Sequence, residues 1–366
     1  ATHRATVVRG GLLLAAHAAL LAGCERPPIQ TTQEGFRGTG MVDVQNPRRL
    51  ERVALENAVP TAQPPAPAVG PAASSVYQNV QVLGGVPVAE FARLMVAITA
   101  WVSPQEGCNY CHDPANLASD AKYTKVVSRR MLQMTQDINA NWQPHVAATG
   151  VTCFTCHRGK AVPSGIWFDH VDGVKARFAG NNGGQNRATP EVGLTSLPFD
   201  PFSTFLQGTT EVRRVSNTAL PSGNTSSIKQ TEWTYALMMH MSQAMGVNCT
   251  YCHNSRSFTD WSQSRPQRAT AWHAIRLVRD VNNNYLVPLQ GVLPPERLGP
   301  AGDAPKVNCE SCHKGVNKPL QGVSMLADYA VLAAPVPPPP PPEPAPAPAV
   351  PADGETAAEV APAAGG

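Results

Sequence analysis

Four short cysteine–histidine motifs are the residues of this 366-residue chain whose types and spacing could do chemistry. Each motif places two cysteines three positions apart, with a histidine directly after the second cysteine. The four copies are Cys108-Asn-Tyr-Cys111-His112, Cys153-Phe-Thr-Cys156-His157, Cys249-Thr-Tyr-Cys252-His253 and Cys309-Glu-Ser-Cys312-His313. They use eight of the nine cysteines, so the reactive side chains of the protein are concentrated in them.

This spacing is typical of covalent haem attachment. The two thiols of CxxCH add to the two vinyl groups of one haem, and the histidine supplies an axial nitrogen to the iron. Zinc could use CxxC pairs as halves of a Cys₄ site, but it leaves the four histidines unexplained. Cysteines of exported proteins often form disulfides, but their three-residue spacing makes disulfides a poor explanation of all four motifs. The sequence therefore predicts four c-type haems, and folding that is coupled to their attachment.

The second axial ligand of each iron decides between electron transfer and substrate binding, because an open iron can bind a substrate. A methionine lies within a helical pattern before each of the first three motifs. The candidates are Met95, Met131 and Met238, with Met134 and Met241 as alternatives one turn away. A single methionine more often fills a core, so the recurrence before three motifs is what favours ligation.

The fourth motif lacks such a methionine, because the duplication described below carries Met131 onto Ala274. His145 has no equivalent in the second half of the chain and could close the iron bound by His313. Three further histidines are alternatives, and the residues alone leave the choice open. They are His170, His240 and His273.

Helical patterns must position these motifs. Apolar residues recur at helical spacing from Val88 to Val102, and Ser103-Pro104 stops that helix. A similar stripe covers 123–134, and helices are expected over about 231–245 and 269–283. Strand patterning is weak. The predicted fold class is mainly α with long irregular connections.

The chain also carries an internal duplication. Asp137-Ile-Asn-Ala-Asn-Trp142 lines up with Asp280-Val-Asn-Asn-Asn-Tyr285, and the motifs before and after them match as well. We expect two pseudo-symmetric halves, each binding two haems. The first di-haem half is predicted over 76–179, a connecting segment over 180–227 and the second di-haem half over 228–332.

The N-terminus has the form of an export signal. Arg4 and Arg9 precede an apolar run, and residues 21–24 (Leu-Ala-Gly-Cys) resemble a bacterial lipobox, which makes Cys24 a lipidation candidate. A retained helix is the alternative. The 14 residues between Arg9 and Cys24 span about 21 Å as a helix, short of the roughly 30 Å hydrocarbon core. Either route attaches residues 1–24 to a membrane and places the body outside the cytoplasm.

Proline and alanine dominate two further segments. Residues 25–75 are predicted to be an N-terminal segment ending in a Pro/Ala spacer, and residues 333–366 a disordered Pro/Ala-rich tail. The net charge is only +3 and no long basic run is present, so the composition does not indicate nucleic-acid binding.

The motifs, their order and the connecting "LPFDPF" from Leu197 resemble one family: the tetrahaem cytochrome c subunit of the photosynthetic reaction centre of purple bacteria. The resemblance covers nearly the whole body of the chain. It implies the following axial pairs: Met95 with His112, Met131 with His157, Met238 with His253, and His145 with His313.

The resemblance also implies partners and a location. The family binds the reaction-centre L and M subunits on the periplasmic face of the photosynthetic membrane. It takes electrons from a soluble cytochrome c or a high-potential iron–sulfur protein and re-reduces the photo-oxidised bacteriochlorophyll pair. It is not an enzyme. The alternatives are a membrane-anchored multihaem cytochrome that oxidises quinol or feeds reductases, and a multihaem enzyme, which needs an open iron.

Overall fold

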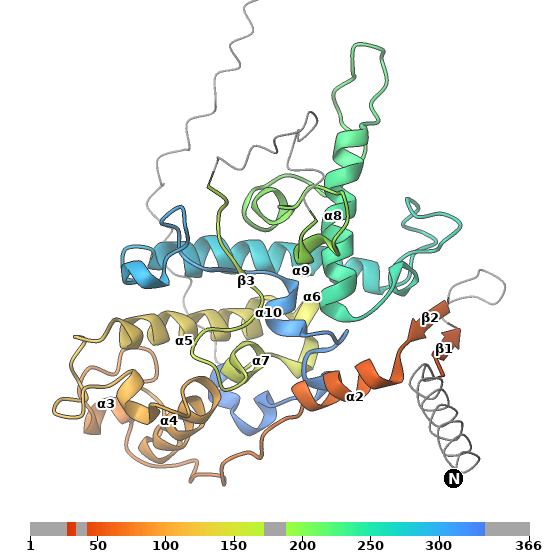
Figure 1. Ribbon diagram of the computed structural model, residues 1–366. Coiled ribbons are helices and arrows are strands. Elements are labelled where there is room, and N and C mark those ends of the chain that lie inside the picture. The colour runs from red at the N-terminus through yellow and green to blue at the C-terminus, as the bar shows by residue number, and fades with distance from the viewer. Residues whose placement is uncertain (1–27, 34–41, 172–187, 334–366) are drawn as a thin grey trace, which may run out of the picture.

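The computed structural model describes residues 28–33, 42–171 and 188–333, and this part of the chain is largely helical with long irregular connections (Figure 1). The helices are α2 (Pro47–Glu56), α3 (Ala73–Val76), α4 (Val88–Val102), α5 (Tyr123–Asn141), α6 (Gln143–Val146), α7 (Cys153–His157), α8 (Ile228–Met245), α9 (Gln267–Asp280) and α10 (Cys309–His313). Cys24 and the tail from residue 334 lie outside the described residues. The predicted helical class is confirmed.

The long helices follow the apolar patterns of the sequence. Helix α4 ends where expected, with the Ser103 backbone N–H donating to Thr99 O at 2.9 Å before Pro104. Helix α9 is shorter than predicted, because the chain widens into a π-helical turn, η6 (Val281–Leu286). Proline at 288 has no N–H to continue a regular ladder beyond this turn.

Two hydrophobic clusters hold the helices together. The first joins α5, α8, α9 and a second π-helical turn, η4 (Ser203–Gln207), around buried residues such as Leu206 and Leu237. The second joins α4 to the C-terminal residues, where the Trp101 and Tyr329 rings meet edge-on at 4.7 Å between centroids. In Figure 1, α10 lies near the centre of the molecule between α5 and α9, whereas α7 lies on the other side of α5, next to α4.

The strands are short. An antiparallel hairpin joins β1 (Gln30–Gln33) to β2 (Val42–Gln45) near the N-terminus. The second pair, β3 (Ile166–Trp167) and β4 (Lys306–Val307), is also antiparallel. It connects the residues after the second motif to the residues just before the fourth motif, so it brings these two motifs together.

The segment predicted to be a spacer packs on the body instead. Ala73 is fully buried, and the Gln63 backbone N–H donates to the Tyr329 hydroxyl at 3.0 Å. The Arg93 side chain donates to the carbonyls of Gln63 and Pro64. A proline-rich stretch lacks some N–H donors but keeps its carbonyl acceptors, and these bind it to α4 and the C-terminal residues.

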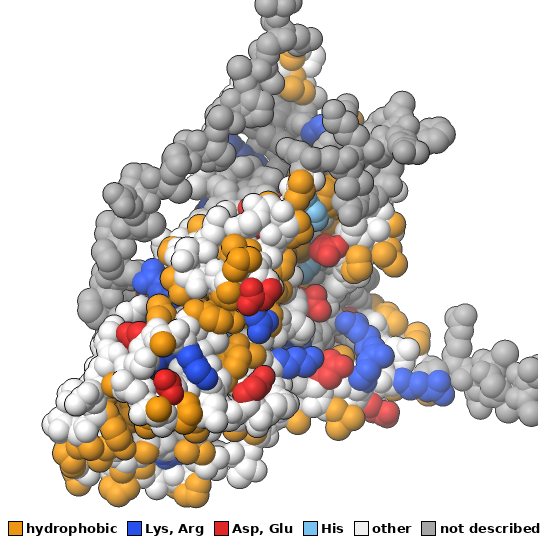
Figure 2. Space-filling view, turned by 60° about the vertical axis from the view of Figure 1, so that its left-hand side comes forward, with side chains coloured by type: hydrophobic (Ala, Val, Ile, Leu, Met, Phe, Trp, Pro, Cys, Tyr) orange, Lys and Arg blue, Asp and Glu red, His pale blue; other side chains and the backbone are white. Residues whose placement is uncertain are grey.

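The surface seen in Figure 2 mixes acidic and basic side chains, while hydrophobic side chains gather at its lower end. The exposed apolar residues of the α3–α4 region include Val76, Tyr77, Val96 and Leu117. Within the described ranges, no helix is both long enough and apolar enough to cross a membrane.

Candidate haem-binding site

The four motifs adopt two local conformations. The first and third motifs lie in 3₁₀ turns, η1 (Gly107–Tyr110) and η5 (Cys249–Tyr251), whereas the second and fourth form the one-turn helices α7 and α10. Cys108 and Cys249 are exposed, and Cys309 is buried. The first and third motifs therefore lie nearer the surface than the fourth.

Helices α7 and α10 begin and end in the same way. Each starts with a reciprocal capping box, formed by Thr152 with Thr155 in α7 and by Asn308 with Ser311 in α10. Each ends with the residue after the motif histidine in the left-handed conformation, at Arg158 (φ 51°) and Lys314 (φ 47°). Both ends of the two motifs are thus set by equivalent hydrogen bonds and backbone angles.

Every motif histidine has its Nδ1 beside a backbone carbonyl. The pairs are His112 with Leu117 O (3.1 Å), His157 with Lys160 O (2.8 Å), His253 with Phe258 O (3.0 Å) and His313 with Val316 O (2.9 Å). A carbonyl can only accept, so Nδ1 carries the proton and donates. This tautomer leaves the Nε2 lone pair free for an iron, and the carbonyl fixes the orientation of the ring.

Burial favours the neutral imidazole that a metal requires at three of the four motif histidines, His157, His253 and His313. It lowers the pKa of His313 to about 4, with a smaller contribution from nearby His145. Burial also lowers the pKa of His157, His253 and His145. Desolvation disfavours the imidazolium, so no proton competes for Nε2 at neutral pH.

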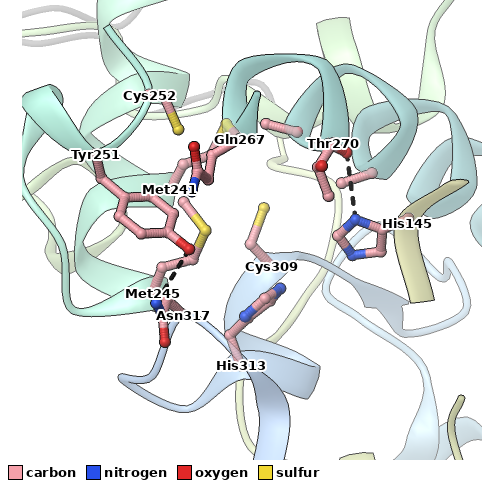
Figure 3. A pocket seen from close by; sticks show the side chains of 12 residues that line it. His145, Met241, Met245, Tyr251, Cys252, Gln267, Thr270, Cys309, His313 and Asn317 are labelled. Carbon is pink, nitrogen blue, oxygen red and sulfur yellow. Dashed lines mark hydrogen bonds between the residues drawn. The ribbon is translucent and has the colours of Figure 1, made fainter. Parts of the chain in front are cut away.

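His145 faces His313 across a cavity, which the close-up in Figure 3 shows. The two ring centroids are 6.0 Å apart, and the Nδ1 of His145 lies 3.3 Å from Thr270 O of α9. With metal–nitrogen bonds of about 2 Å, an iron held by both Nε2 atoms separates the ring centroids by roughly 6 Å. The residues present therefore fit an iron with two imidazole ligands.

The other candidate histidines pack against aromatic rings. His170 meets Phe199 at 4.5 Å, His240 meets Phe202 at 4.6 Å and His273 meets Trp272 at 4.9 Å, all between ring centroids and all edge-on. These contacts turn the three rings toward partners other than His313. Of the alternatives left open by the sequence, His145 is the one that the fold brings opposite the fourth motif.

The methionine candidates lie on the expected helices. Thr99, one turn beyond Met95 on α4, has its hydroxyl 4.0 Å from the Cys108 sulfur, so this part of α4 faces the first motif. Met131 and Met134 on α5 and Met238 on α8 pack against the first hydrophobic cluster. Met241 and Met245 instead line the cavity between His145 and His313 (Figure 3).

The second and fourth motifs adjoin each other. The sulfur atoms of Cys156 and Cys312 lie 2.9 Å apart, although 156 positions separate them in the chain. Groups attached to these two sulfurs would be immediate neighbours.

The cysteine geometry does not support zinc or disulfide frameworks. In the part of the chain that the structure describes, no three side chains of the metal-binding types converge on one point. In the described residues none of the eight motif cysteines forms a disulfide, and burial raises the pKa of Cys153 and Cys309 to about 12. Thiols that are not joined in disulfides, each pair followed by an imidazole, suit thioether attachment of a porphyrin.

Two buried asparagines hold the second and fourth motifs in place, and sequence reasoning assigned them no role. Asn139 donates to Val151 O and accepts from Val151 N, two residues before Cys153. Asn282 makes the same two bonds with Val307, two residues before Cys309. Their signal was present in the duplicated segment, where asparagine recurs at the equivalent position in both halves.

The N-terminal segment forms hydrogen bonds with residues that flank two of the motifs. Gln45 of β2 donates to Gly246 O at 2.7 Å, and Asn248 donates to Val42 O at 2.5 Å, just before the third motif. Beyond α2, Asn57 donates to Lys314 O at 3.2 Å, directly after the fourth motif. The flanks of two motifs are thus tied to the part of the N-terminal segment that precedes the Pro/Ala spacer.

CxxCH thiols, oriented imidazoles and a facing histidine on a helical scaffold define a c-type cytochrome, a protein with covalently bound haem. The particular family follows from comparison with known proteins: residues 25–333 match the photosynthetic reaction centre cytochrome c subunit family, and the chain belongs to it.

Three relatives show how extensive the similarity is. The photosynthetic reaction center cytochrome c subunit of Rubrivivax gelatinosus is 58% identical over 314 residues, covering 85% of this chain and 86% of the relative. That of Thermochromatium tepidum is 52% identical over 310 residues, covering 85% and 76%. That of Roseobacter denitrificans is 45% identical over 325 residues, covering 84% and 86%.

Proposed function

We propose that this chain binds four c-type haems and delivers electrons to the photo-oxidised bacteriochlorophyll pair of a photosynthetic reaction centre. The observation that carries the proposal is the pairing of His145 with His313 across a haem-sized separation. This pairing would supply the second axial ligand of the iron at the fourth motif. The fourth motif is the one for which the sequence offers no methionine. A closed iron exchanges electrons and does not bind substrate, so the chain acts as an electron-transfer subunit and not as an enzyme.

The proposed axial ligands complete the other three sites. Met95 pairs with His112, Met131 with His157, and Met238 with His253. Helix α4 supports the first pair through the Thr99–Cys108 contact. Thioether ligands raise the potential of an iron, which suits donation to a strongly oxidising partner.

The arrangement of the motifs suggests a chain of haems. The contact between Cys156 and Cys312 makes the second and fourth sites the central pair, and the exposed first and third motifs form its ends. The matching capping boxes and asparagine bonds support two pseudo-symmetric halves with two haems each. Electrons would enter at one surface end and leave at the other.

The partners and location follow from the family. We place the protein on the periplasmic face of the photosynthetic membrane, bound to the L and M subunits and attached through its N-terminus at Cys24. The donor is a soluble cytochrome c or a high-potential iron–sulfur protein. Exposed Leu117 and Phe258, whose carbonyls hold His112 and His253, give both end sites an apolar surface for contact with other proteins.

Ligation is the property to measure first. Low-temperature absorption and EPR of the purified protein should show four low-spin haems, three with the near-infrared band of methionine-ligated Fe(III) and one with two histidines. A high-spin haem that accepts added ligands would overturn the proposal. That result would favour a multihaem enzyme, whereas a majority of bis-histidine haems would favour a quinol-oxidising or reductase-linked cytochrome.

A further inference from the structure

A buried amide borders the cavity that the third and fourth motifs share. Gln267 is the first residue of α9, and its Oε1 is buried with no hydrogen-bond partner among the described residues. Cys252 of the third motif lines the same cavity, and so do Cys309 and His313 of the fourth motif. A buried amide is costly unless it is paired, so this position calls for a polar group inside the cavity.

Helix α9 directs Gln267 to this site. Ala271 and Ala274 line the same cavity four and seven residues later, which is the spacing of one helical face. The small side chains at these two positions leave space beside the helix for a large planar group. Gln267 therefore places an amide at the start of the α9 face that borders the cavity.

The equivalent position in the first half of the chain is arranged differently. The duplication that aligns Asp137 with Asp280 places Thr124 of α5 at the position of Gln267. The Thr124 hydroxyl donates to Tyr110 O at 2.5 Å and so has a partner within its own half. The unpaired amide is thus a feature of the second half and not a general consequence of the repeated fold.

Other polar side chains of the cavity wall bind each other. Asn317 donates to the Tyr251 hydroxyl at 3.0 Å, and Figure 3 draws this bond on the side of the cavity away from His145. The buried oxygen of Gln267 has no such partner in the described part of the chain. Its partner must therefore come from the group that fills the cavity.

The chemistry of a porphyrin identifies that partner. The four nitrogens of a haem bind the iron, so its propionate carboxylates are the groups that can form hydrogen bonds. None of the described residues that line the cavity is Lys, Arg, Asp or Glu, so a carboxylate there needs a neutral donor. The Oε1 and Nε2 of glutamine exchange places by a half-turn about the last side-chain bond, and Nε2 then donates to the carboxylate.

We propose that Gln267 donates a hydrogen bond to a haem propionate at the boundary of the third and fourth sites and thereby raises the potential of that haem. This inference rests on the proposed function, because it requires haems at these two motifs. A propionate carboxylate stabilises Fe(III) through its negative charge, and a hydrogen bond offsets part of that charge. Gln267 would thus act on an iron that it does not touch.

A spectroelectrochemical titration of the intact four-haem protein tests the assignment. Gln267→Leu removes the amide, and we expect it to shift the Fe(III)/Fe(II) ratio of one haem about tenfold toward Fe(III) at a fixed applied potential, a change of about 59 mV. Gln230→Leu is the matched control. Gln230 of α8 also has a buried Oε1 without a partner in the described residues, but it lines a second cavity that no motif residue borders. Its loss should leave all four potentials in place.

EPR of the same samples identifies the haem that responds. A shift confined to the bis-histidine haem assigns the propionate to the fourth site, and a shift confined to one methionine-ligated haem assigns it to the third site. Both results support the hydrogen bond. Unchanged potentials, or an equal shift of all four haems, would overturn it.

Gln267→Glu supplies a readout that altered packing alone would not change. The ionised glutamate repels the propionate, so it should lower the same potential further than leucine does, and acidification should reverse the effect as the new carboxyl group gains a proton and donates it. A potential that is the same at both pH values would count against the inference. Because the proposed function requires four low-spin haems in the wild-type spectrum, unchanged variant potentials in a protein with that spectrum would remove only the role of Gln267.

Discussion

A single hydrogen bond decides which nitrogen of each motif histidine is available. The carbonyls of Leu117, Lys160, Phe258 and Val316 each accept an Nδ1 proton and leave the opposite nitrogen free to act as a ligand. Thr270 O does the same for His145 from a different helix. In each case a carbonyl that would not itself touch an iron therefore determines which nitrogen is available to bind one.

Exchanging the proposed histidine ligand for a thioether should change one potential. His145→Met is expected to raise the potential of the iron bound by His313, by on the order of 100 mV, because thioether sulfur stabilises Fe(II) more than imidazole does. A spectroelectrochemical titration measures the shift. His273→Met, on the neighbouring helix α9, is the control and should leave all four potentials in place. An unchanged titration of His145→Met would remove this residue from the ligand set.

His240 should make the protein sensitive to acid. Burial lowers its pKa from 6.5 to about 4, so the folded state prefers the neutral ring. The contribution of the neutral His240 ring to the free energy of unfolding is complete above pH 6.5 and is lost as pH falls toward 4. We expect His240→Phe to reduce the loss of unfolding free energy over this window by up to about 3 kcal/mol. Denaturant unfolding at several pH values measures it, and parallel curves for the two proteins would contradict the expectation.

At the scale of elements, one-turn helices are positioned by bonds from elsewhere in the fold. Helix α10 has only five residues, too few to be stable alone. Its start is held by Asn282 of η6, which also donates to Leu206 O of η4 at 2.9 Å. The π-helical turns therefore connect the central segment of the chain to the fourth motif.

Removing the hydrogen bonds of Asn282 should destabilise the fourth motif selectively. Asn282→Ala leaves buried Leu206 O and the Val307 N–H without their partner, which we expect to cost about 2–4 kcal/mol. Thermal unfolding measures the loss, and the spectrum of the His313 haem should broaden. Asn283→Ala, which removes one bond to Gln207 O, is the neighbouring control and should cost less. Equal effects of the two substitutions would argue against a special role for Asn282.

At the scale of the whole molecule, the interior of the described residues consists of two hydrophobic clusters, and a mainly apolar cavity lies between His145 and His313. The attached porphyrins would supply much of the missing interior. Folding and haem attachment should then depend on each other, as they do for metal centres whose ligands come from distant parts of a chain.

Loss of one attachment site should therefore weaken the whole fold. The double substitution Cys309→Ser and Cys312→Ser is expected to reduce the covalent haem count from four to three and to lower the melting temperature by several degrees. Mass spectrometry and thermal unfolding measure the two effects. Cys24→Ser alters the one cysteine outside the motifs and should keep all four haems while releasing the protein from the membrane. Four haems in the double variant would show that these thiols are not an attachment site.

The sequence by itself determined the chemistry that is local. The CxxCH spacing, the helical stripes around Met95 and Met131 and the duplication all depend on residues close together in the chain, so they could be recognised before any fold was known. It also indicated Asn139 and Asn282 as a repeated pair without revealing their task.

Only the tertiary structure decided what depends on distant contacts. It chose His145 over His170, His240 and His273 by turning one ring toward His313 and the others toward aromatic partners. It joined the second and fourth motifs at Cys156 and Cys312 and packed the supposed spacer onto the body. These pairings involve residues more than 100 positions apart, and no local pattern encodes which distant surfaces bury each other.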